Sequence, residues 1–142
     1  VYDPNGKLIS SVTPKDLKHP IGICCLKNEE YLVADQSEDL VKHYDLQGNL
    51  LASLKKKDTT FGDLYIMTFS NTHGIFASDH WSSRILHLDS SLNVQGVYGN
   101  SGRRVGQFNR IGWMDTYNDL LAVADMCNNR IQFFDAKKTL SS

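Results

Sequence analysis

A short segment, Asp79-His80-Trp81-Ser82-Ser83, carries the most distinctive binding chemistry in the chain. A tryptophan at the tip of a loop offers a large, rigid surface that anchors a protein side chain or stacks on a nucleotide base. We therefore predict that Trp81, together with His80, belongs to a partner-binding site. The alternative is that Trp81 folds back over the edge of its own sheet.

Two groups of basic residues have the right charge to contact phosphate. Lys55, Lys56 and Lys57 form an uninterrupted run, and further arginines lie in a glycine-rich segment. Cationic side chains neutralise RNA phosphates, and such contacts make the affinity fall steeply with salt. For the lysine run, a solvated linker is the simpler interpretation. The six candidate RNA- or phosphate-binding residues are Lys55, Lys56, Lys57, Arg103, Arg104 and Arg110.

The sequence contains none of the motifs that mark common catalytic sites. It has no Gly-x-Ser-x-Gly, no phosphate-binding loop and no His-Glu-x-x-His, so we predict that the chain is not an enzyme. Its histidines and cysteines lack the spacing of zinc ligands, and therefore no metal and no cofactor are predicted. Cys24, Cys25 and Cys127 are best explained as buried free thiols in a reducing compartment, which favours a cytoplasmic location.

The candidate loops follow segments that recur along the chain. Three apolar segments end in Asp35, Asp79 and Asp125, and each is followed after a short loop by a second apolar segment that also ends in aspartate. These closing aspartates lie 42, 44 and 46 residues apart. A period near 44 residues is typical of four-stranded β-propeller blades. The closing aspartates are Asp3, Asp45, Asp89 and Asp135.

Each repeat supplies four short strands separated by turn residues. In the first complete repeat we expect strands at 21–26, 31–35, 40–45 and 50–54. No window has a helical period, so the predicted class is all-β: a single domain with three four-stranded propeller blades. The predicted boundaries are a fourth strand of a preceding blade at 1–12, blades at 13–54 and 55–99, and the first three strands of another blade at 100–142.

Several segments resemble NHL repeats. The residues 99–110 are similar to the glycine-rich linker that enters such a repeat, and 124–135 resemble its most recognisable motif: an aspartate, a polar loop, Asn-Arg and a strand that closes on aspartate. His19-Pro20-Ile21-Gly22-Ile23 resembles the start of its first strand, whereas Leu40 replaces the motif arginine in the first repeat. The resemblance covers nearly the whole chain and implies an NHL β-propeller of the tripartite-motif (TRIM-NHL) type.

The resemblance also implies a function. In tripartite-motif ubiquitin ligases the propeller chooses partners while a separate RING domain supports ubiquitin transfer, and several members of the family bind single-stranded or hairpin RNA. We therefore expect a non-catalytic platform that recognises a protein partner, with RNA binding in post-transcriptional regulation as the alternative. Some NHL-like propellers are metal-dependent lyases, but the convergent ligands of that chemistry are not found in this sequence. No segment has the length of a membrane span.

Because the strands of a blade alternate in direction, its loops fall on two opposite faces. One face collects the segments between second and third strands and the segments between repeats; it is mildly basic, whereas the opposite face is acidic. The tryptophan loop, its counterpart in the third repeat and the basic groups all fall on the first face. The predicted partner-binding residues are His80, Trp81, Met126, Asn128 and Asn129.

Aspartates recur at one position on this face, at the end of each second strand. Such recurrence indicates that Asp35, Asp79 and Asp125 cap backbone N–H groups of their own loops and are not catalytic. We expect Arg84 and Arg130 to pair with carboxylates of the same or an adjacent blade.

Three blades do not close a ring, because closed propellers usually contain four to eight. The strand expected at 1–12 would complete the three-stranded repeat at 100–142. We prefer the interpretation that the ring, of about six blades, is completed by a longer chain. The alternative is that a second copy closes it by exchanging the terminal strand, and homo-oligomerisation also remains open.

Overall fold

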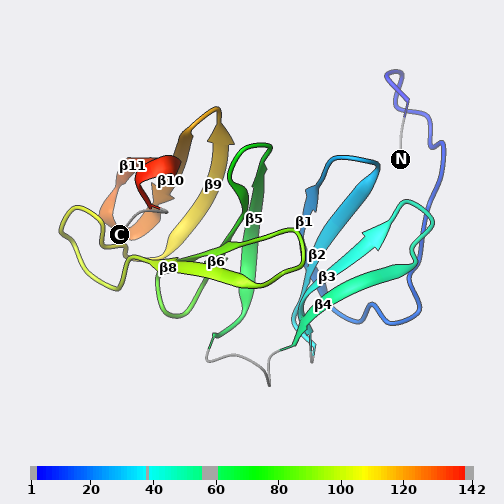
Figure 1. Ribbon diagram of the computed structural model, residues 1–142, viewed down its shortest axis with the longest axis horizontal. Coiled ribbons are helices and arrows are strands. Elements are labelled where there is room, and N and C mark those ends of the chain that lie inside the picture. Colours follow the sequence, from blue (N-terminus) through cyan, green and yellow to red (C-terminus); the bar gives the residue numbers. More distant parts are fainter. Residues whose placement is uncertain (1–2, 38, 56–60, 140–142) are drawn as a thin grey trace.

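The chain folds into three antiparallel β-sheets that follow one another along the sequence (Figure 1). The structure, a computed structural model, describes residues 3–37, 39–55 and 61–139. It confirms the all-β class and the three successive sheets. Blade 1 consists of β1 (Pro20–Cys25), β2 (Glu30–Asp35), β3 (Asp39–Asp45) and β4 (Leu50–Lys55). Blade 2 consists of β5 (Leu64–Ser70), β6 (Gly74–Asp79), β7 (Arg84–Leu88) and β8 (Val94–Tyr98). Blade 3 consists of β9 (Ile111–Tyr117), β10 (Leu120–Asp125) and β11 (Arg130–Asp135). Two short helices, η2 (Met126–Asn128) and α1 (Ala136–Thr139), also belong to blade 3.

The first strands of the blades lie next to one another. Within each sheet the strands pair in chain order, so β1, β5 and β9 each form one edge. β1 packs beside β5, and β5 packs beside β9 (Figure 1). This is the radial arrangement of blades around a central axis, with the first strand of each blade innermost.

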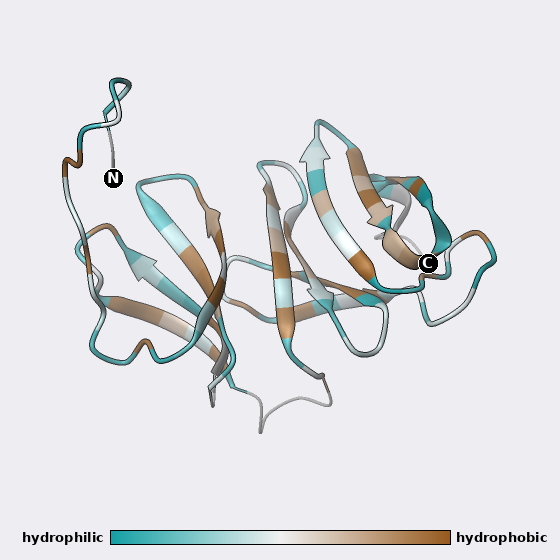
Figure 2. Ribbon diagram, turned by 180° about the vertical axis from the view of Figure 1, so that it is seen from behind, coloured by the Kyte–Doolittle hydropathy of each residue, from teal (hydrophilic) through white to brown (hydrophobic). Residues whose placement is uncertain are grey.

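The hydrophobic core lies between neighbouring sheets. One cluster joins Leu32 of blade 1 to Leu86 of blade 2, and a second joins Phe76 of blade 2 to Leu121 of blade 3. Figure 2 shows the apolar parts of these strands in brown. Because blade 2 has a neighbour on each side, both faces of β6 and β7 are buried, and their residues are apolar without a strict alternation.

A buried aspartate at the end of each second strand anchors the rim of the blade. Asp35, Asp79 and Asp125 are at most 2% exposed. Arg84 Nη2 lies 2.7 Å from the carboxylate of Asp79, and Arg130 Nε lies 2.8 Å from that of Asp125. The predicted pairing of these two arginines is confirmed, within the same blade in both cases.

In blades 1 and 3 the same carboxylate also holds the loop that enters the blade. Asp35 accepts the backbone N–H groups of Lys18 and Ser37, both at 3.0 Å, and Asp125 accepts that of Asn109 at 2.7 Å. The expectation that each carboxylate caps only its own loop is therefore incomplete. The aspartate ties together two loops that come from different ends of the repeat, and we call this arrangement the aspartate clamp.

Blade 1 lacks the motif arginine and uses a lysine in its clamp. Lys42 Nζ lies 3.1 Å from Asp35 Oδ2 and also donates to the backbone carbonyl of Asp16. In blade 3, Gln132 occupies the corresponding position and likewise donates both to the clamp aspartate and to a carbonyl of the entering loop. A donor two residues further along β3 thus replaces the missing guanidinium.

Two expectations are wrong. Within the segment 1–12, where a fourth strand was expected, residues 9–12 form no strand, since a strand exists only where a second strand accepts its backbone hydrogen bonds. The three cysteines are free as expected, but Cys25 and Cys127 are exposed, and only Cys24 is half-buried, where burial raises its pKa to about 11. The described part of the chain contains no helix with the length and apolar character needed to cross a membrane.

The aspartate clamps should make the fold sensitive to acid. Burial alone would raise the pKa of Asp125, but hydrogen bonds from Asn109, Asn128 and Arg130 hold it below its usual value; the pKa of Asp35 is lowered in the same way. A lowered pKa contributes stability above the unfolded-state value, and that stability is lost as the pH falls toward the folded-state value. We expect the free energy of unfolding, measured by urea denaturation, to decrease below about pH 4.

The variant Asp125→Asn isolates one clamp. It removes the charge that Arg130 needs and should cost about 2 to 3 kcal/mol at neutral pH, while reducing the acid dependence. Asp3→Asn is the matched control, because that carboxylate lies in an exposed turn. Equal losses from the two substitutions, or a stability that is unchanged between neutral pH and about pH 3, would contradict the role of the clamps.

Candidate binding face

The loops that enter the blades lie against the loops that follow the second strands. In each blade the first residue after the second strand donates its backbone N–H to a carbonyl of the entering loop, at 3.0 to 3.1 Å. The donor–acceptor pairs are Gln36 with His19, His80 with Asp63, and Met126 with Arg110. We call this rim the binding face; its described residues are 13–19, 36–37, 61–63, 80–83, 99–110 and 126–129.

Three rings from blade 2 contact one another in a row at the binding face. The ring of Tyr65 stacks on that of His80 at 4.5 Å, and His80 meets Trp81 edge-on at 5.3 Å. Trp81 is 71% exposed, and its indole N–H donates to Asp63 Oδ2 at 3.2 Å. This aromatic row, formed by Tyr65, His80 and Trp81, therefore presents a fixed tryptophan to solvent. The indole does not fold back over the sheet edge.

Two members of the aromatic row are departures from the repeat. Tyr65 stands where blades 1 and 3 have Ile21 and Gly112, two residues after the equivalent carbonyls of the entering loops, and Trp81 stands where they have Ser37 and Cys127. Tyr65 is also held from blade 1, because Gln36 Nε2 donates to its hydroxyl at 2.6 Å. Both departures occur in one blade and meet through His80. The repeat alone does not require either of them.

The aromatic row borders a groove of about 390 Å³ along the three first strands. Its lining contains Gly22 of β1 and Gly112 of β9, where the absence of side chains leaves space, and the exposed ring of Trp113. Arg110 and Met126 line it from the rim. This axial groove is largely apolar with one cation at its border, a composition suited to an apolar side chain flanked by a polar or acidic group.

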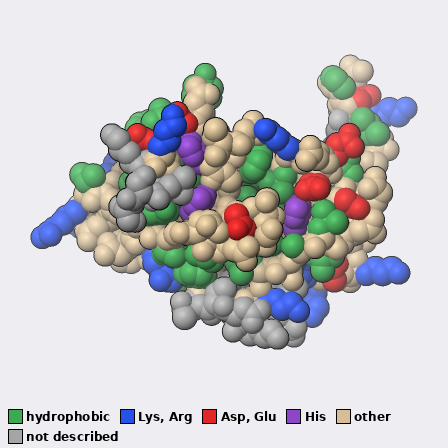
Figure 3. All heavy atoms as spheres, in the orientation of Figure 1, with side chains coloured by type: hydrophobic (Ala, Val, Ile, Leu, Met, Phe, Trp, Pro, Cys, Tyr) green, Lys and Arg blue, Asp and Glu red, His purple; other side chains and the backbone are tan. Residues whose placement is uncertain are grey.

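The predicted basic residues lie apart from one another. Arg110 is exposed at the axial groove, while Arg103 and Arg104 are exposed on the entering loop of blade 3, whose backbone carbonyls accept hydrogen bonds from Arg130. Lys55 is exposed at the end of β4, and the predicted candidates Lys56 and Lys57 lie outside the described residues. In the view of Figure 3 the lysine and arginine side chains are dispersed and form no single patch.

The three candidates from blade 3 have different positions. Met126 is 47% exposed and lines the axial groove. The amide of Asn128 donates to the carbonyl of Gly102 and to Asp125, both at 2.9 Å, so it holds the loop together. Asn129 is exposed and ends η2 in the left-handed conformation, with φ of 51°. Of these three residues, only Met126 lies in the groove that His80 also lines.

Sequence reasoning missed Tyr65 and Gln36. The signal for Tyr65 was an aromatic residue at a position where the other two repeats have Ile21 and Gly112. Gln36 occupies the same position as His80, directly after the clamp aspartate. Its contact with Tyr65 joins two blades and could not be read from either repeat alone.

The carboxylates on the binding face are engaged in the fold. Asp35, Asp79 and Asp125 all bind N–H groups or cationic side chains. Among the described residues, no group of three or more His, Cys, Asp or Glu side chains is arranged to hold a metal ion. The chemistry that remains available at the groove is aromatic stacking, apolar contact and hydrogen bonding.

No protein-family model and no curated protein matches this chain. Solved structures do. The chain is similar to the Pan2 WD40 domain of Neurospora crassa, with a TM-score of 0.68 and 16% identity over 97% of this chain and 43% of that one. It is also similar to a streptogramin B lyase (TM-score 0.63, 13% identity, 83% of this chain and 38% of that one) and to the virginiamycin B lyase of Staphylococcus aureus (TM-score 0.61, 12% identity, 94% and 46%).

These similarities show the fold. The neighbours are β-propeller proteins, which confirms the predicted propeller architecture with an arc that is not closed. The chain spans less than half the length of each of these three proteins. The assignment to the TRIM-NHL type stays a prediction.

Substituting the two glycines that line the axial groove tests its geometry. A Cβ added at Gly22 would overlap the backbone carbonyl oxygen of Tyr65, whereas one at Gly112 would lie 3.1 Å from Cβ of Met126, a tight contact that a small shift relieves. We expect Gly22→Ala to destabilise the chain by about 2 kcal/mol or more, because β1 and β5 must separate. Gly112→Ala should cost less than about 1 kcal/mol. Urea denaturation would measure the free energy of unfolding of both variants. Equal losses of stability would contradict this packing.

Proposed function

We propose that this chain is a non-catalytic recognition platform that binds a protein partner at the aromatic row and axial groove. The observation that carries this proposal is that Tyr65 and Trp81, two departures from the repeat, both contact His80 and present the 71% exposed ring of Trp81 at the rim. Residues that only build the fold follow the repeat. These two do not: the half-buried Tyr65 lines the axial groove, and Trp81 adds exposed aromatic surface at the rim.

A protein ligand fits the composition of this site. Tryptophan and tyrosine dominate the energetics of protein interfaces, especially where they border a pocket that excludes water. Trp81 is already oriented by its bond to Asp63, so little conformational entropy is lost when a ligand side chain packs against it. Arg110 at the groove border favours a ligand with an acidic or carbonyl group next to its apolar side chain.

The NHL-like residues of the sequence suggest a setting for this platform. We propose that it selects substrates for a TRIM-NHL-like ubiquitin ligase in the cytoplasm, where a separate domain would support ubiquitin transfer. The motif arginine paired with its clamp aspartate, seen for Arg84 and Arg130, supports the resemblance in blades 2 and 3. Some propellers of similar fold are lyases, and we propose recognition here because the clamp carboxylates are occupied by structural contacts.

Trp81→Ala tests the proposal. Peptides selected from a random displayed library on the unmodified chain would be measured with purified variants by fluorescence anisotropy. We expect Trp81→Ala to raise the Kd about 30-fold or more, the effect of losing an interface hot spot of about 2 kcal/mol.

Leu51→Ala is the matched control, because Leu51 is a half-exposed apolar residue on β4, outside the binding face. It should leave the Kd unchanged. If no peptide is enriched, or if both substitutions weaken binding equally, the aromatic row is not the recognition site.

RNA is the second candidate ligand. It is favoured by the stack of aromatic rings with Arg110 beside it, and by the exposed side chains of Arg103 and Arg104 on the same face. Binding of a single-stranded or hairpin RNA should then weaken steeply between low and physiological salt, and Arg104→Glu should reduce that salt dependence. Filter binding or anisotropy with labelled RNA would measure it. An RNA signal that is undetectable at low ionic strength would reject this candidate.

A further inference from the structure

The loop between β6 and β7 is held between two entering loops. The backbone N–H of His80 donates to the carbonyl of Asp63 at 3.1 Å, and the indole N–H of Trp81 donates to the carboxylate of the same residue. At the other end of the loop, the hydroxyl oxygen of Ser83 accepts the backbone N–H of Arg110 at 3.2 Å. Residues of opposite charge, one from blade 2 and one from blade 3, are therefore fixed at the two ends of a single short loop.

The position that ends each entering loop carries a different side chain in each blade. His19, Asp63 and Arg110 are equivalent, because each supplies the carbonyl that accepts the N–H of the residue after the clamp aspartate. That contact uses only backbone atoms, so it leaves the side chain at this position undetermined. The acid in blade 2 and the arginine in blade 3 are therefore not required by the repeat, and they distinguish this part of the binding face.

The guanidinium of Arg110 is available to a ligand. Arg110 is exposed and lines the axial groove together with His80 and Met126. With the residues that the structure describes, its side chain forms no hydrogen bond or ion pair, whereas the side chains of Arg84 and Arg130 bind their clamp aspartates. A guanidinium binds a carboxylate through two parallel hydrogen bonds. Arg110 therefore suits the carboxylate of a ligand whose apolar side chain occupies the axial groove.

The backbone of Arg110 is held in a conformation that its equivalents do not share. Arg110 has a φ of 66° and Ser83, which contacts it, has a φ of 51°, whereas neither His19 nor Asp63 has a positive φ. Residues other than glycine rarely adopt this conformation, and where they do the surrounding structure imposes it. Here Ser83 accepts the N–H of Arg110, and the N–H of Met126 donates to its carbonyl. The backbone that carries the guanidinium is thus fixed before a ligand binds.

The other end of the loop suits a positive charge. The ring of Trp81 is 71% exposed, and the carboxylate of Asp63 lies at its indole N–H, 3.2 Å away. A Cβ added at Gly62 would lie 3.3 Å from Cδ1 of Trp81, so the ring also packs closely on the entering loop. The positive charge of Arg84 is balanced by Asp79, 2.7 Å away. An ammonium or guanidinium placed over the indole face gains a cation–π interaction next to a carboxylate.

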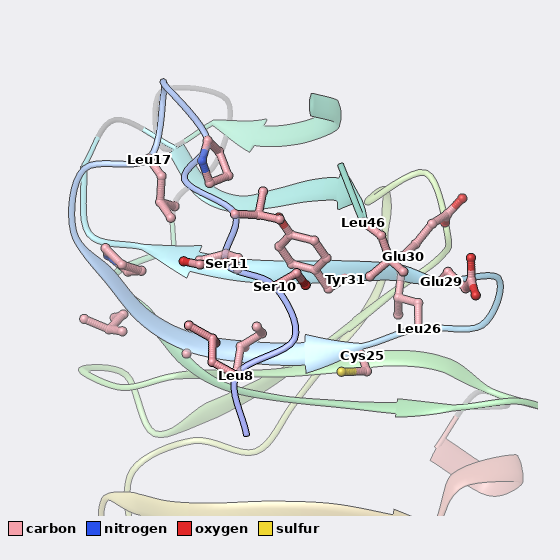
Figure 4. Close-up of a pocket in the computed structure, with 17 residues that line it drawn as sticks. Leu8, Ser10, Ser11, Leu17, Cys25, Leu26, Glu29, Glu30, Tyr31 and Leu46 are labelled. Carbon is pink, nitrogen blue, oxygen red and sulfur yellow. The ribbon is translucent and has the colours of Figure 1, made fainter. Parts of the chain in front are cut away.

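A larger hollow elsewhere lacks this combination of charges. A hollow of about 740 Å³ lies between the N-terminal segment and strands β1 and β2 (Figure 4). Its lining is largely apolar and contains two acids, Glu29 and Glu30, but no lysine or arginine. Glu30 lies 2.8 Å from the ring of His43 and is therefore engaged within blade 1. An apolar ligand in this hollow would be insensitive to the charge of Arg110, so a charge test separates the two sites.

We propose that the partner is a peptide segment that carries both charges: a carboxylate bound by Arg110 and a cationic side chain packed on Trp81 beside Asp63, with an apolar side chain in the axial groove. This inference rests on the proposed recognition of a protein and names its class of ligand. All of these contacts belong to blade 2 or to its junction with blade 3. RNA fits them less well, because it has no cation for Trp81 and Asp63 repels its phosphates.

A double-mutant cycle tests the contact of Arg110. The tightest peptide selected on the unmodified chain would be synthesised in two further forms, one with its acidic residue replaced by the matching amide and one with its basic residue replaced by methionine. Fluorescence anisotropy would give the Kd of each form. Arg110→Gln and the loss of the peptide's acid should each raise the Kd about tenfold, and together still about tenfold, because both changes remove the same contact.

A second cycle tests the cationic contact. Asp63→Asn keeps an oxygen that accepts the indole N–H of Trp81 and removes only the negative charge. It should raise the Kd about fivefold, and it should have no effect on the peptide that lacks its basic residue. Changes at different ends should multiply, so Arg110→Gln combined with the loss of the peptide's basic residue should raise the Kd about fiftyfold.

Arg104→Gln is the matched control, because Arg104 is an exposed arginine of the same face and the net charge changes equally. It should leave the Kd unchanged. If the peptides bind through Trp81 but contain no charged residues, or if Arg110→Gln weakens every form of the peptide to the same extent, this inference is overturned while the proposed function stands. If no peptide is enriched, both fail together.

Discussion

The aspartate clamp is the interaction on which the rest of the structure depends. A carboxylate buried at the end of a second strand is stable only if hydrogen bonds replace its lost water, and here the donors come from the entering loop as well as from the blade itself. Asp125 thus fixes Asn109 and Arg130 together. Because the next residue, Met126, then donates to the entering loop, the loops of the binding face are tied to the sheets.

The clamps were partly predictable from sequence, because some of their contacts join residues that are close together in one repeat. In the second and third repeats an arginine lies five residues after the aspartate, so their pairing requires only the strand reversal between β6 and β7 or between β10 and β11. The use of Lys42 in blade 1 was not predictable in the same way. It depends on which face of β3 residue 42 occupies and on how closely the entering loop approaches, and both are set by packing between segments far apart in sequence.

The aromatic row was also predictable only in part. Trp81 was identified because its loop position follows from the repeat, and its exposure agrees with that position. Tyr65 was missed because its orientation depends on β5, whose pairing with β6 shifts register between Leu64 and Met67. An irregularity of this kind redirects a side chain, and a strict alternation of residues cannot anticipate it. Gln36, which reaches Tyr65 from another blade, required the arrangement of two sheets.

Exposed apolar side chains in this chain therefore have two different origins. Comparing equivalent positions of the three repeats distinguishes the two. Phe133 is 67% exposed at a position where blade 2 buries His87, so its exposure reflects a missing neighbour and points to another blade. Trp81 is 71% exposed at a position where the other blades have small residues, so no neighbouring blade accounts for it. A residue that follows the repeat belongs to the construction of the ring, whereas one that departs from it at an exposed rim is available for a ligand. A further blade packed on blade 3 would cover Phe133 and leave Trp81 free, so ring construction and the proposed recognition do not compete for the same surface.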